Sequence, residues 1–168
     1  MTAEPEILFS EAEIAKGVAD LAREIAPLKP DFAVPILAGA FVFAADLLRA
    51  LSREGLSLPM EFLWLRSYDA QQAGEISVLC GPTGGVRGKT VLLVDGVLDR
   101  GTTIVKSRAL LKEAGAKSVI TAVAVDKLRP DAVTHADFAM FQGVADFIVG
   151  YGMDEDGRDR GLPYIGYR

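Results

Sequence analysis

The centre of the chain contains two continuous apolar runs, at residues 90–94 (TVLLV) and 118–125 (SVITAVAV). Runs of this kind are typical of strands that are buried on both faces of a sheet. Between them lie a polar turn, residues 95–103 (DGVLDRGTT), and a helical pattern at 104–114 that Gly115 ends. A strand, a helix and a second strand in this order form a βαβ unit with a right-handed crossover. The sequence therefore predicts an α/β fold with a mainly parallel twisted sheet flanked by helices.

Two helices and a strand are expected before this central unit. Ser10 and Glu13 have the spacing of a capping box, which predicts the start of a helix. Residues 32–39 (FAVPILAG) predict a short buried strand, but Pro35 argues against a regular central strand because proline has no N–H to donate. Residues 41–54 have the period of a second helix. We expect its inward face to hold Phe41, Ala44, Leu48 and Leu51.

Two further strands are expected at residues 60–68 and 75–80. They lie on either side of residues 69–75 (DAQQAGE), whose polar, glycine-containing composition predicts an exposed and flexible loop.

The length of 168 residues suits a single globular domain, and we find no repeat, low-complexity tract or long linker that divides it. After residue 129 the apolar pieces become short and irregular. We therefore expect one domain over residues 1–168, with a core over about 10–130 and a small hood. The hood is expected to comprise about 131–168 together with the N-terminus.

Composition excludes several classes of protein. The 18 basic and 23 acidic side chains give a net charge of −5, and no basic stripe is visible, which disfavours nucleic-acid binding. No apolar run approaches the ~20 residues that span a bilayer, so we expect no membrane partner. The single Cys80 cannot support a disulfide framework. These features predict a soluble cytoplasmic protein.

The turn DGVLDRGTT is the strongest candidate for a functional site. It follows the carboxyl end of a predicted strand, where ligands bind in open α/β sheets. Gly101 allows close backbone approach, Thr102 and Thr103 add hydroxyls, and the following helix directs its dipole here, so the turn suits a phosphate dianion. Asp95 and Asp99 would then need sugar hydroxyls, a protonated base or Mg²⁺ as partners. An ordinary strand–helix turn, with Asp95 as a local cap, explains the pattern equally well.

This turn is also the centre of a family resemblance. VLLVDGVLDRGTT resembles the phosphoribosyl-pyrophosphate (PRPP) motif of the type I phosphoribosyltransferases. Four other segments, in the right order, resemble the hypoxanthine (hypoxanthine-guanine) phosphoribosyltransferase branch of that family. They are ILAGAFVFAADLLRAL, FLWLRSYDAQQAGEISV, VDKLRP and DFIVGYGMDEDGRDRGLPYIGY. The resemblance covers nearly the whole chain, and it implies the type I phosphoribosyltransferase fold.

The resemblance further implies transfer of 5-phosphoribosyl from PRPP to hypoxanthine, and to guanine, with pyrophosphate and a purine nucleoside monophosphate as products. Asp99 would be the general base at the purine N7. The 5′-phosphate would be held by Arg100, Gly101, Thr102 and Thr103, and the pyrophosphate by Ala38, Gly39 and Arg160. The ribose hydroxyls would contact Asp95.

For the base and the metal, the resemblance implies a second set of residues. Lys127 would donate to the purine O6, Phe147 would stack on the ring, and the Ile148 backbone would contact its edge. Mg²⁺ would be the cofactor, bound by Asp154 and Asp95, and Ser67 and Tyr68 would belong to a flexible catalytic loop. A homodimer or homotetramer is implied as well.

The chain departs from the family at three positions. Gly96 replaces the second acid of the PRPP motif, Arg100 replaces a threonine, and Ala38 stands where relatives often have a basic side chain. The missing carboxylate corresponds to about 1–3 kcal/mol of PRPP binding if its hydroxyl partner is left unpaired. Two alternatives therefore stay open: a non-catalytic protein that binds PRPP or nucleotides, and a phosphoribosyltransferase for xanthine or another base.

Overall fold

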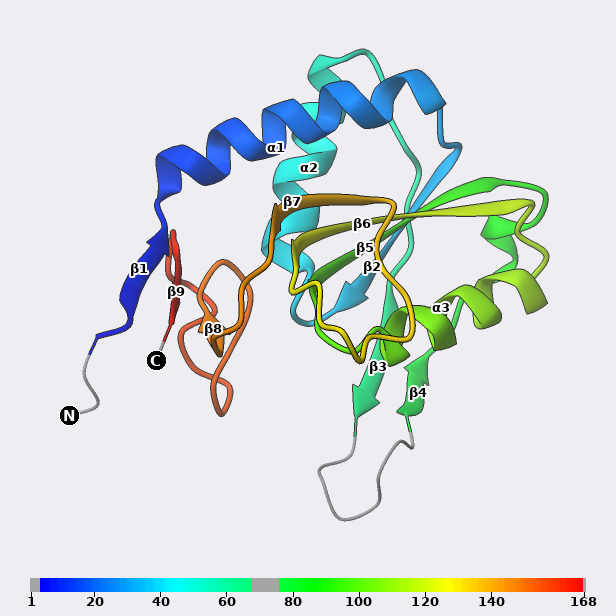
Figure 1. Ribbon diagram of the computed structural model, residues 1–168. Helices are drawn as coiled ribbons and strands as arrows, with labels where there is room; N and C mark the ends of the chain where they lie inside the picture. Colours follow the sequence, from blue (N-terminus) through cyan, green and yellow to red (C-terminus); the bar gives the residue numbers. More distant parts are fainter. Residues whose placement is uncertain (1–3, 68–75, 168) are drawn as a thin grey trace.

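The computed structural model describes residues 4–67 and 76–167. A six-stranded sheet lies between α1 (Glu11–Ile25) and α2 (Phe41–Arg53) on one face and α3 (Thr102–Glu113) on the other (Figure 1). Its strand order is β4-β3-β2-β5-β6-β7. The strands are β2 (Phe32–Leu37), β3 (Leu63–Ser67), β4 (Ile76–Cys80), β5 (Thr90–Leu98), β6 (Ser118–Asp126) and β7 (Phe138–Gln142). Only β4 runs antiparallel to its neighbour, so the predicted parallel α/β fold is confirmed.

A smaller antiparallel sheet lies beside the main one and joins the two ends of the chain (Figure 1). Its order is β1 (Glu6–Phe9), β9 (Ile165–Tyr167), β8 (Ile148–Val149). Short 3₁₀ helices, Ala26–Leu28 and Gly84–Val86, lie in two of the connections. The sequence placed residues from about 131 onward in the hood, yet β7 pairs in parallel with β6 and extends the main sheet. Among the described residues, we find no helix with the length and apolar content that a membrane crossing requires.

Alternation along the central strands builds two cores. Leu92 and Val94 of β5 face α1 and α2, whereas Leu93 faces α3, because successive side chains point to opposite faces. The capping box at Ser10 is present, since Glu13 N–H donates to Ser10 and the Glu13 carboxylate accepts from Ser10 N–H at 2.8 Å. The expected inward side chains of α1 are buried: Ile14, Val18, Leu21 and Ile25.

The inward face of α2 differs from the expectation. Phe41 is 44% exposed, while Phe43 and Leu47 are fully buried beside Ala44 and Leu51. Leu48 is only partly buried. The three-and-four spacing of a helix fits both sets of residues, and the prediction was wrong because packing against the sheet fixes the rotation of the helix.

Pro35 lies inside β2, which is a central strand after all, but the β2–β3 ladder is interrupted at this residue. Ala33 N–H donates to Pro59 O on the β3 side, and residues two apart on a parallel strand point their N–H groups the same way. Pro35 therefore lacks its donor on the β3 side. It lies between the Ala33–Met60 bridge and the β2–β3 ladder, which begins at Ile36. The sheet accepts proline because no ladder bond is required at this point.

Strand β5 is longer than expected. It continues through Asp95 to Leu98, because β6 continues beside it and pairs Asp95 with Val123 and Leu98 with Asp126. Since α3 begins at Thr102, the expected nine-residue turn is in fact residues 99–101. Asp95 therefore lies within β5, and Asp99 directly follows the last residue of this strand.

Candidate active site

The short turn after β5 and the first turn of α3 enclose a cavity of about 200 Å³. Gly101 is the N-cap of α3 and has φ +83°, a left-handed conformation that glycine adopts without strain. The first N–H groups of a helix have no intrahelical acceptor, and the residues that carry them here, 102–104, line this cavity at the positive end of the helix dipole. Arg100, Thr102 and Thr103 also line it. The structure thus brings together every residue that the sequence assigned to the 5′-phosphate.

A second cavity, of about 310 Å³, shares Asp95, Val97 and Asp99 with the first. It is also lined by Lys127, Phe147, Ile148 and Asp154. Phe147 is 53% exposed, so its ring is available to a ligand, whereas Ile148 is buried. The predicted base-binding residues therefore lie next to the phosphate cavity, with Asp99 at the boundary between the two.

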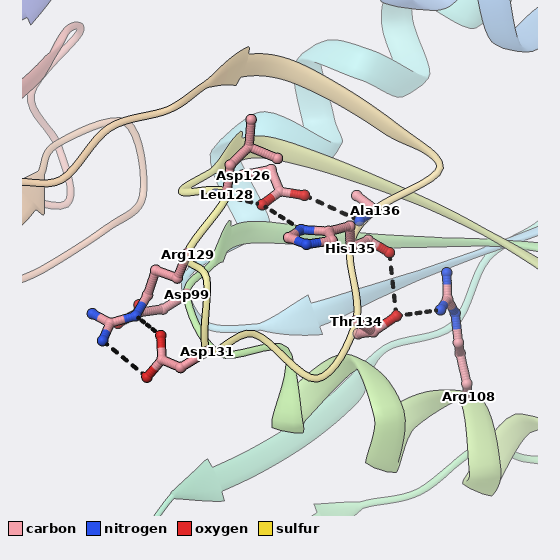
Figure 2. Close-up of polar contacts among 9 residues, drawn as sticks. All are labelled: Asp99, Arg108, Asp126, Leu128, Arg129, Asp131, Thr134, His135 and Ala136. Atoms are coloured by element: carbon pink, nitrogen blue, oxygen red, sulfur yellow. Dashed lines mark hydrogen bonds and ion pairs between the residues drawn. The ribbon is translucent and has the colours of Figure 1, made fainter.

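The loop after β6, part of which Figure 2 shows, begins with Lys127, and Lys127 lines this cavity. Asp126 is 1% exposed, and its carboxylate accepts from Leu128 N–H at 2.9 Å and from Ala136 N–H at 3.2 Å. His135 Nδ1 lies 3.4 Å from the same carboxylate. Asp126 thus closes the loop from 127 to 136, and Lys127 N–H donates to Leu98 O at 3.0 Å, which ties the loop to the end of β5.

Exposed charged side chains of the loop after β6 pair with one another, and one of them contacts Asp99 at the end of β5 (Figure 2). Arg129 contacts Asp99 at 3.3 Å and binds Asp131 at 2.8 and 3.1 Å, and Arg100 lies 3.6 Å from Asp131. The Arg129 guanidinium lowers the pKa of the Asp131 carboxyl, and Asp131 and Asp99 raise the pKa of Arg129. Arg129 therefore connects the candidate general base with the phosphate turn.

Asp95 is the carboxyl whose acidity burial changes most. Burial raises the pKa of Asp95 to about 7, although the Gly96 N–H that donates to it at 2.7 Å acts in the opposite direction. A carboxylate with so few compensating partners is suited to receive a hydroxyl or a cation from a ligand.

Asp95→Asn is expected to increase the free energy of unfolding above pH 7 by on the order of 2 kcal/mol. The native state keeps the Asp95 proton up to about pH 7, whereas the unfolded chain releases it near 3.8. Between these values the native state binds more protons, so this carboxyl destabilises the fold as the pH rises. Urea unfolding at pH 8 and pH 4.5 measures the effect, which should shrink at the lower pH. A variant that is less stable at pH 8 would contradict this account.

Asp154 lies at the edge of the second cavity and is held by its own segment. Its two oxygens accept from Gly157 N–H at 2.7 Å and pair with Arg160 at 2.8 Å. Arg160 also donates to Gly152 O at 2.7 Å, and it lines a different cavity, of about 420 Å³, between α1, α2 and the hood. The structure therefore joins Arg160 to the site through Asp154 and not by direct exposure to the second cavity.

The β2–α2 connection places Gly39 on the wall of the second cavity, and the Leu37–Ala38 peptide bond there is cis. Ala38 immediately precedes this wall residue. Ser67 is the last residue of β3, and Tyr68 lies outside the described residues.

The oxygen ligands for a cation are spread around the cavity. Within residues 4–67 and 76–167, no three His, Cys, Asp or Glu side chains come close enough to hold a metal ion by themselves. Mg²⁺ usually binds through one or two carboxylates and completes its shell with waters and substrate phosphates. The separate carboxylates of Asp95 and Asp154 fit that mode, provided that the substrate brings its own oxygens.

The sequence alone indicated no role for four residues whose contacts hold the loop after Lys127, namely Asp126, Arg129, Asp131 and His135. One signal was available, because Asp126 ends a buried apolar run and directly precedes Lys127. The contact between Arg129 and Asp99 joins two different loops, and no local pattern indicates it.

Together, a parallel sheet, a phosphate cavity at a helix N-terminus and an adjoining cavity with an aromatic ring and a lysine define a nucleotide-type transferase site. The phosphoribosyl transferase domain matches residues 6–156, and the chain belongs to the phosphoribosyltransferase family.

Several similar relatives are hypoxanthine or hypoxanthine-guanine phosphoribosyltransferases. The hypoxanthine phosphoribosyltransferase of Escherichia coli (strain K12) is 33% identical and matches 96% of this chain and 93% of its own length. The hypoxanthine-guanine phosphoribosyltransferase of Aquifex aeolicus is 35% identical, over 95% of this chain and 92% of its own. A ternary substrate complex of a hypoxanthine phosphoribosyltransferase variant from Trypanosoma cruzi superposes with a TM-score of 0.88 at 28% identity, covering 96% and 94% of the two chains.

Proposed function

We propose that this protein is a purine salvage phosphoribosyltransferase. It transfers 5-phosphoribosyl from PRPP to hypoxanthine, and to guanine, and releases pyrophosphate with IMP or GMP. The observation that carries the proposal is the pair of adjoining cavities, one suited to a phosphate and one to a planar base, with Asp99 at their boundary. Family membership supports the reaction class.

In this reaction the 5′-phosphate binds the N–H groups of residues 101–104, with Arg100 adding positive charge. Asp95, which lines both cavities, accepts hydrogen bonds from the ribose hydroxyls. Asp99 takes the proton from the purine as the ring nitrogen attacks C1 of the ribose, which increases the nucleophilicity of that nitrogen. Arg129 keeps the Asp99 carboxylate oriented from the opposite side.

The base is selected by contacts on the second cavity. Phe147 presents an exposed ring for stacking, and the buried Ile148 backbone meets the edge of the purine. Lys127 donates to the O6 carbonyl, whereas the amino group of adenine would place a donor against a donor.

Pyrophosphate departs from C1 of the ribose as a highly charged leaving group. We propose Mg²⁺ as the cofactor: Asp95 and Asp154 would hold it together with substrate oxygens, and it would offset negative charge on the diphosphate. Backbone groups at Ala38 and Gly39 bind the diphosphate, and Arg160 keeps Asp154 in place at 2.8 Å. Ser67 and Tyr68 belong to the proposed catalytic loop.

The organisation of the protein is proposed on the same basis. We infer one phosphoribosyltransferase domain over residues 1–168, a homodimer or homotetramer, and a cytoplasmic location without nucleic-acid or membrane partners. The net charge of −5 supports the absence of a nucleic-acid partner.

The direct test incubates the purified protein with PRPP, Mg²⁺ and one purine at a time, and nucleotide formation is followed by chromatography. We expect rapid nucleotide formation with hypoxanthine and guanine and a far lower rate with adenine. Xanthine as the preferred base would replace the substrate assignment, and no product with any 6-oxopurine would reject the enzyme.

A second candidate function is a non-catalytic protein that binds PRPP or nucleotides, and Gly96 in place of a second acid favours it. Tight nucleotide binding by calorimetry without turnover would support this alternative.

Lys127→Ala is expected to lower the preference for hypoxanthine over adenine by about tenfold, because one hydrogen bond to a charged donor corresponds to about 1.5 kcal/mol or more. The ratio of kcat/KM for the two bases measures the effect. Lys106→Ala, an exposed lysine on α3, is a matched control and should keep the wild-type ratio. An unchanged preference in Lys127→Ala would show that another group selects the base.

A further inference from the structure

Gly96 stands next to Asp95 in β5, and the backbone of the β2–α2 connection lies directly against it. A Cβ atom added at Gly96 would lie 2.8 Å from Gly39 O and 3.1 Å from the Gly39 carbonyl carbon. Contacts below 3.0 Å are essentially never made by a real Cβ, and here the neighbour is backbone, which cannot rotate away as a side chain can. Any side chain at position 96 must therefore move residue 39.

The Gly39 carbonyl is also confined from the other side. A Cβ at Gly152, in the hood, would lie 2.7 Å from the same Gly39 oxygen. Met153 Cγ would lie 3.6 Å from a Cβ at position 96, so the hood closes the space beside it. The carbonyl is held between β5 and the hood, and both neighbouring positions are glycine.

The connection that carries this carbonyl has little freedom to shift along its own chain. Ala40 N–H donates to Ile36 O at 3.3 Å, and Phe41 N–H donates to Ala38 O at 3.2 Å. The helix that follows is anchored in the core by Phe43 and Leu47, which are fully buried. If Gly39 is displaced, the cavity wall that it forms therefore changes shape, while the helix keeps its position.

Gly39, Asp95, Asp99 and Asp154 line the same cavity of about 310 Å³. A carboxylate added at position 96 would also bring its negative charge against the Gly39 carbonyl oxygen, which repels it. Both the space and the charge at this position favour a residue without a side chain.

We propose that Gly96 is a positioning residue for PRPP binding. Because Gly96 has no side chain, the Gly39 carbonyl can pack directly against β5, and this contact fixes the position of the cavity wall that faces the diphosphate. The acid that related motifs carry here is replaced by close backbone packing, so restoring it impairs the enzyme. This inference rests on the proposed function, because it assigns the affected step to PRPP.

The test compares Gly96→Ala and Gly96→Asp with the wild type. Gly85→Ala is a matched control, because its Cβ would also be crowded, at 3.1 Å from Phe32 Cζ, but at the opposite end of β2. We expect both changes at Gly96 to raise KM for PRPP about tenfold or more and to leave KM for hypoxanthine within about threefold. Gly96→Asp should be no better than Gly96→Ala, and Gly85→Ala should keep both constants.

A kcat/KM for PRPP above the wild-type value in Gly96→Asp would overturn the inference, as would an unchanged KM for PRPP in Gly96→Ala. Circular dichroism reports folding, and an unfolded Gly96→Ala chain would assign Gly96 to stability alone and also overturn it. If the wild type forms no nucleotide, the proposed function fails as catalysis, and PRPP dissociation constants from calorimetry replace KM in the same comparison. A wild type that binds no PRPP overturns both.

Discussion

Asp99→Asn is expected to lower kcat by about 10²–10⁴-fold while KM for PRPP stays within about threefold. Asparagine keeps the shape of aspartate and still lines both cavities, but it cannot take a proton from the purine. The 5′-phosphate contacts proposed for residues 101–104 are left in place. Steady-state kinetics with hypoxanthine at saturating PRPP measure the loss.

Asp131→Asn provides the matched control for this experiment. Asp131 is an exposed carboxylate that binds the same Arg129 as Asp99, at 2.8 and 3.1 Å, but it lines neither cavity. Its change should therefore alter kcat by no more than about threefold, since exposed ion pairs contribute little. A comparable loss in both variants, or a large rise in KM for PRPP in Asp99→Asn, would contradict the assignment of Asp99 as the base.

Gly101→Ala is expected to raise KM for PRPP about 100-fold and to lower the free energy of unfolding by about 2–4 kcal/mol. Alanine is strained at φ +83°, and its Cβ would lie 2.8 Å from Thr134 Cγ2 and 3.0 Å from Thr134 O. Thr134 is held in place by Arg108, which donates to its hydroxyl at 3.1 Å (Figure 2). The turn must therefore move, and the N–H groups that face the phosphate move with it.

Gly55→Ala separates backbone strain from loss of the phosphate site. Gly55 has nearly the same conformation, φ +82°, and its added Cβ would meet no described atom within 4 Å. This variant should lose only about 1–2 kcal/mol of stability and keep the wild-type KM for PRPP. Thermal unfolding and PRPP kinetics of both variants distinguish backbone strain from loss of the phosphate site. A normal KM for PRPP in Gly101→Ala would show that the phosphate binds elsewhere.

The central βαβ unit was predictable because a local sequence pattern indicates each of its elements. β5 and β6 are continuous apolar runs, and α3 lies between them after a glycine-containing turn. The capping box at Ser10 was predictable for the same reason, since its contacts join residues three apart. The end of β5 was misplaced because Asp95 and Gly96 are poor strand formers, yet β6 pairs with Asp95, Val97 and Leu98 and so extends the strand past them.

Errors arose wherever distant parts of the chain decide a local feature. Pro35 is tolerated in β2 because the β3 ladder has a gap at that point, which only the strand order reveals. β7 resembles an isolated apolar piece in sequence, but its pairing with β6 makes it the edge of the main sheet. Phe41 and Phe43 are equivalent by helical spacing, and the sheet selects Phe43.

The order of the motifs along the chain was sufficient to indicate the family and the residues that gather at the carboxyl ends of the strands. Periodicity, turn chemistry and the acids after β5 are local properties, and parallel strands must end at one edge of a sheet. The placement of Arg129 against Asp99, the separation of Arg160 from the second cavity and the packing of Gly39 on Gly96 were decided by tertiary structure alone. These are contacts between loops whose relative positions depend on how the whole core packs, so no short stretch of sequence encodes them.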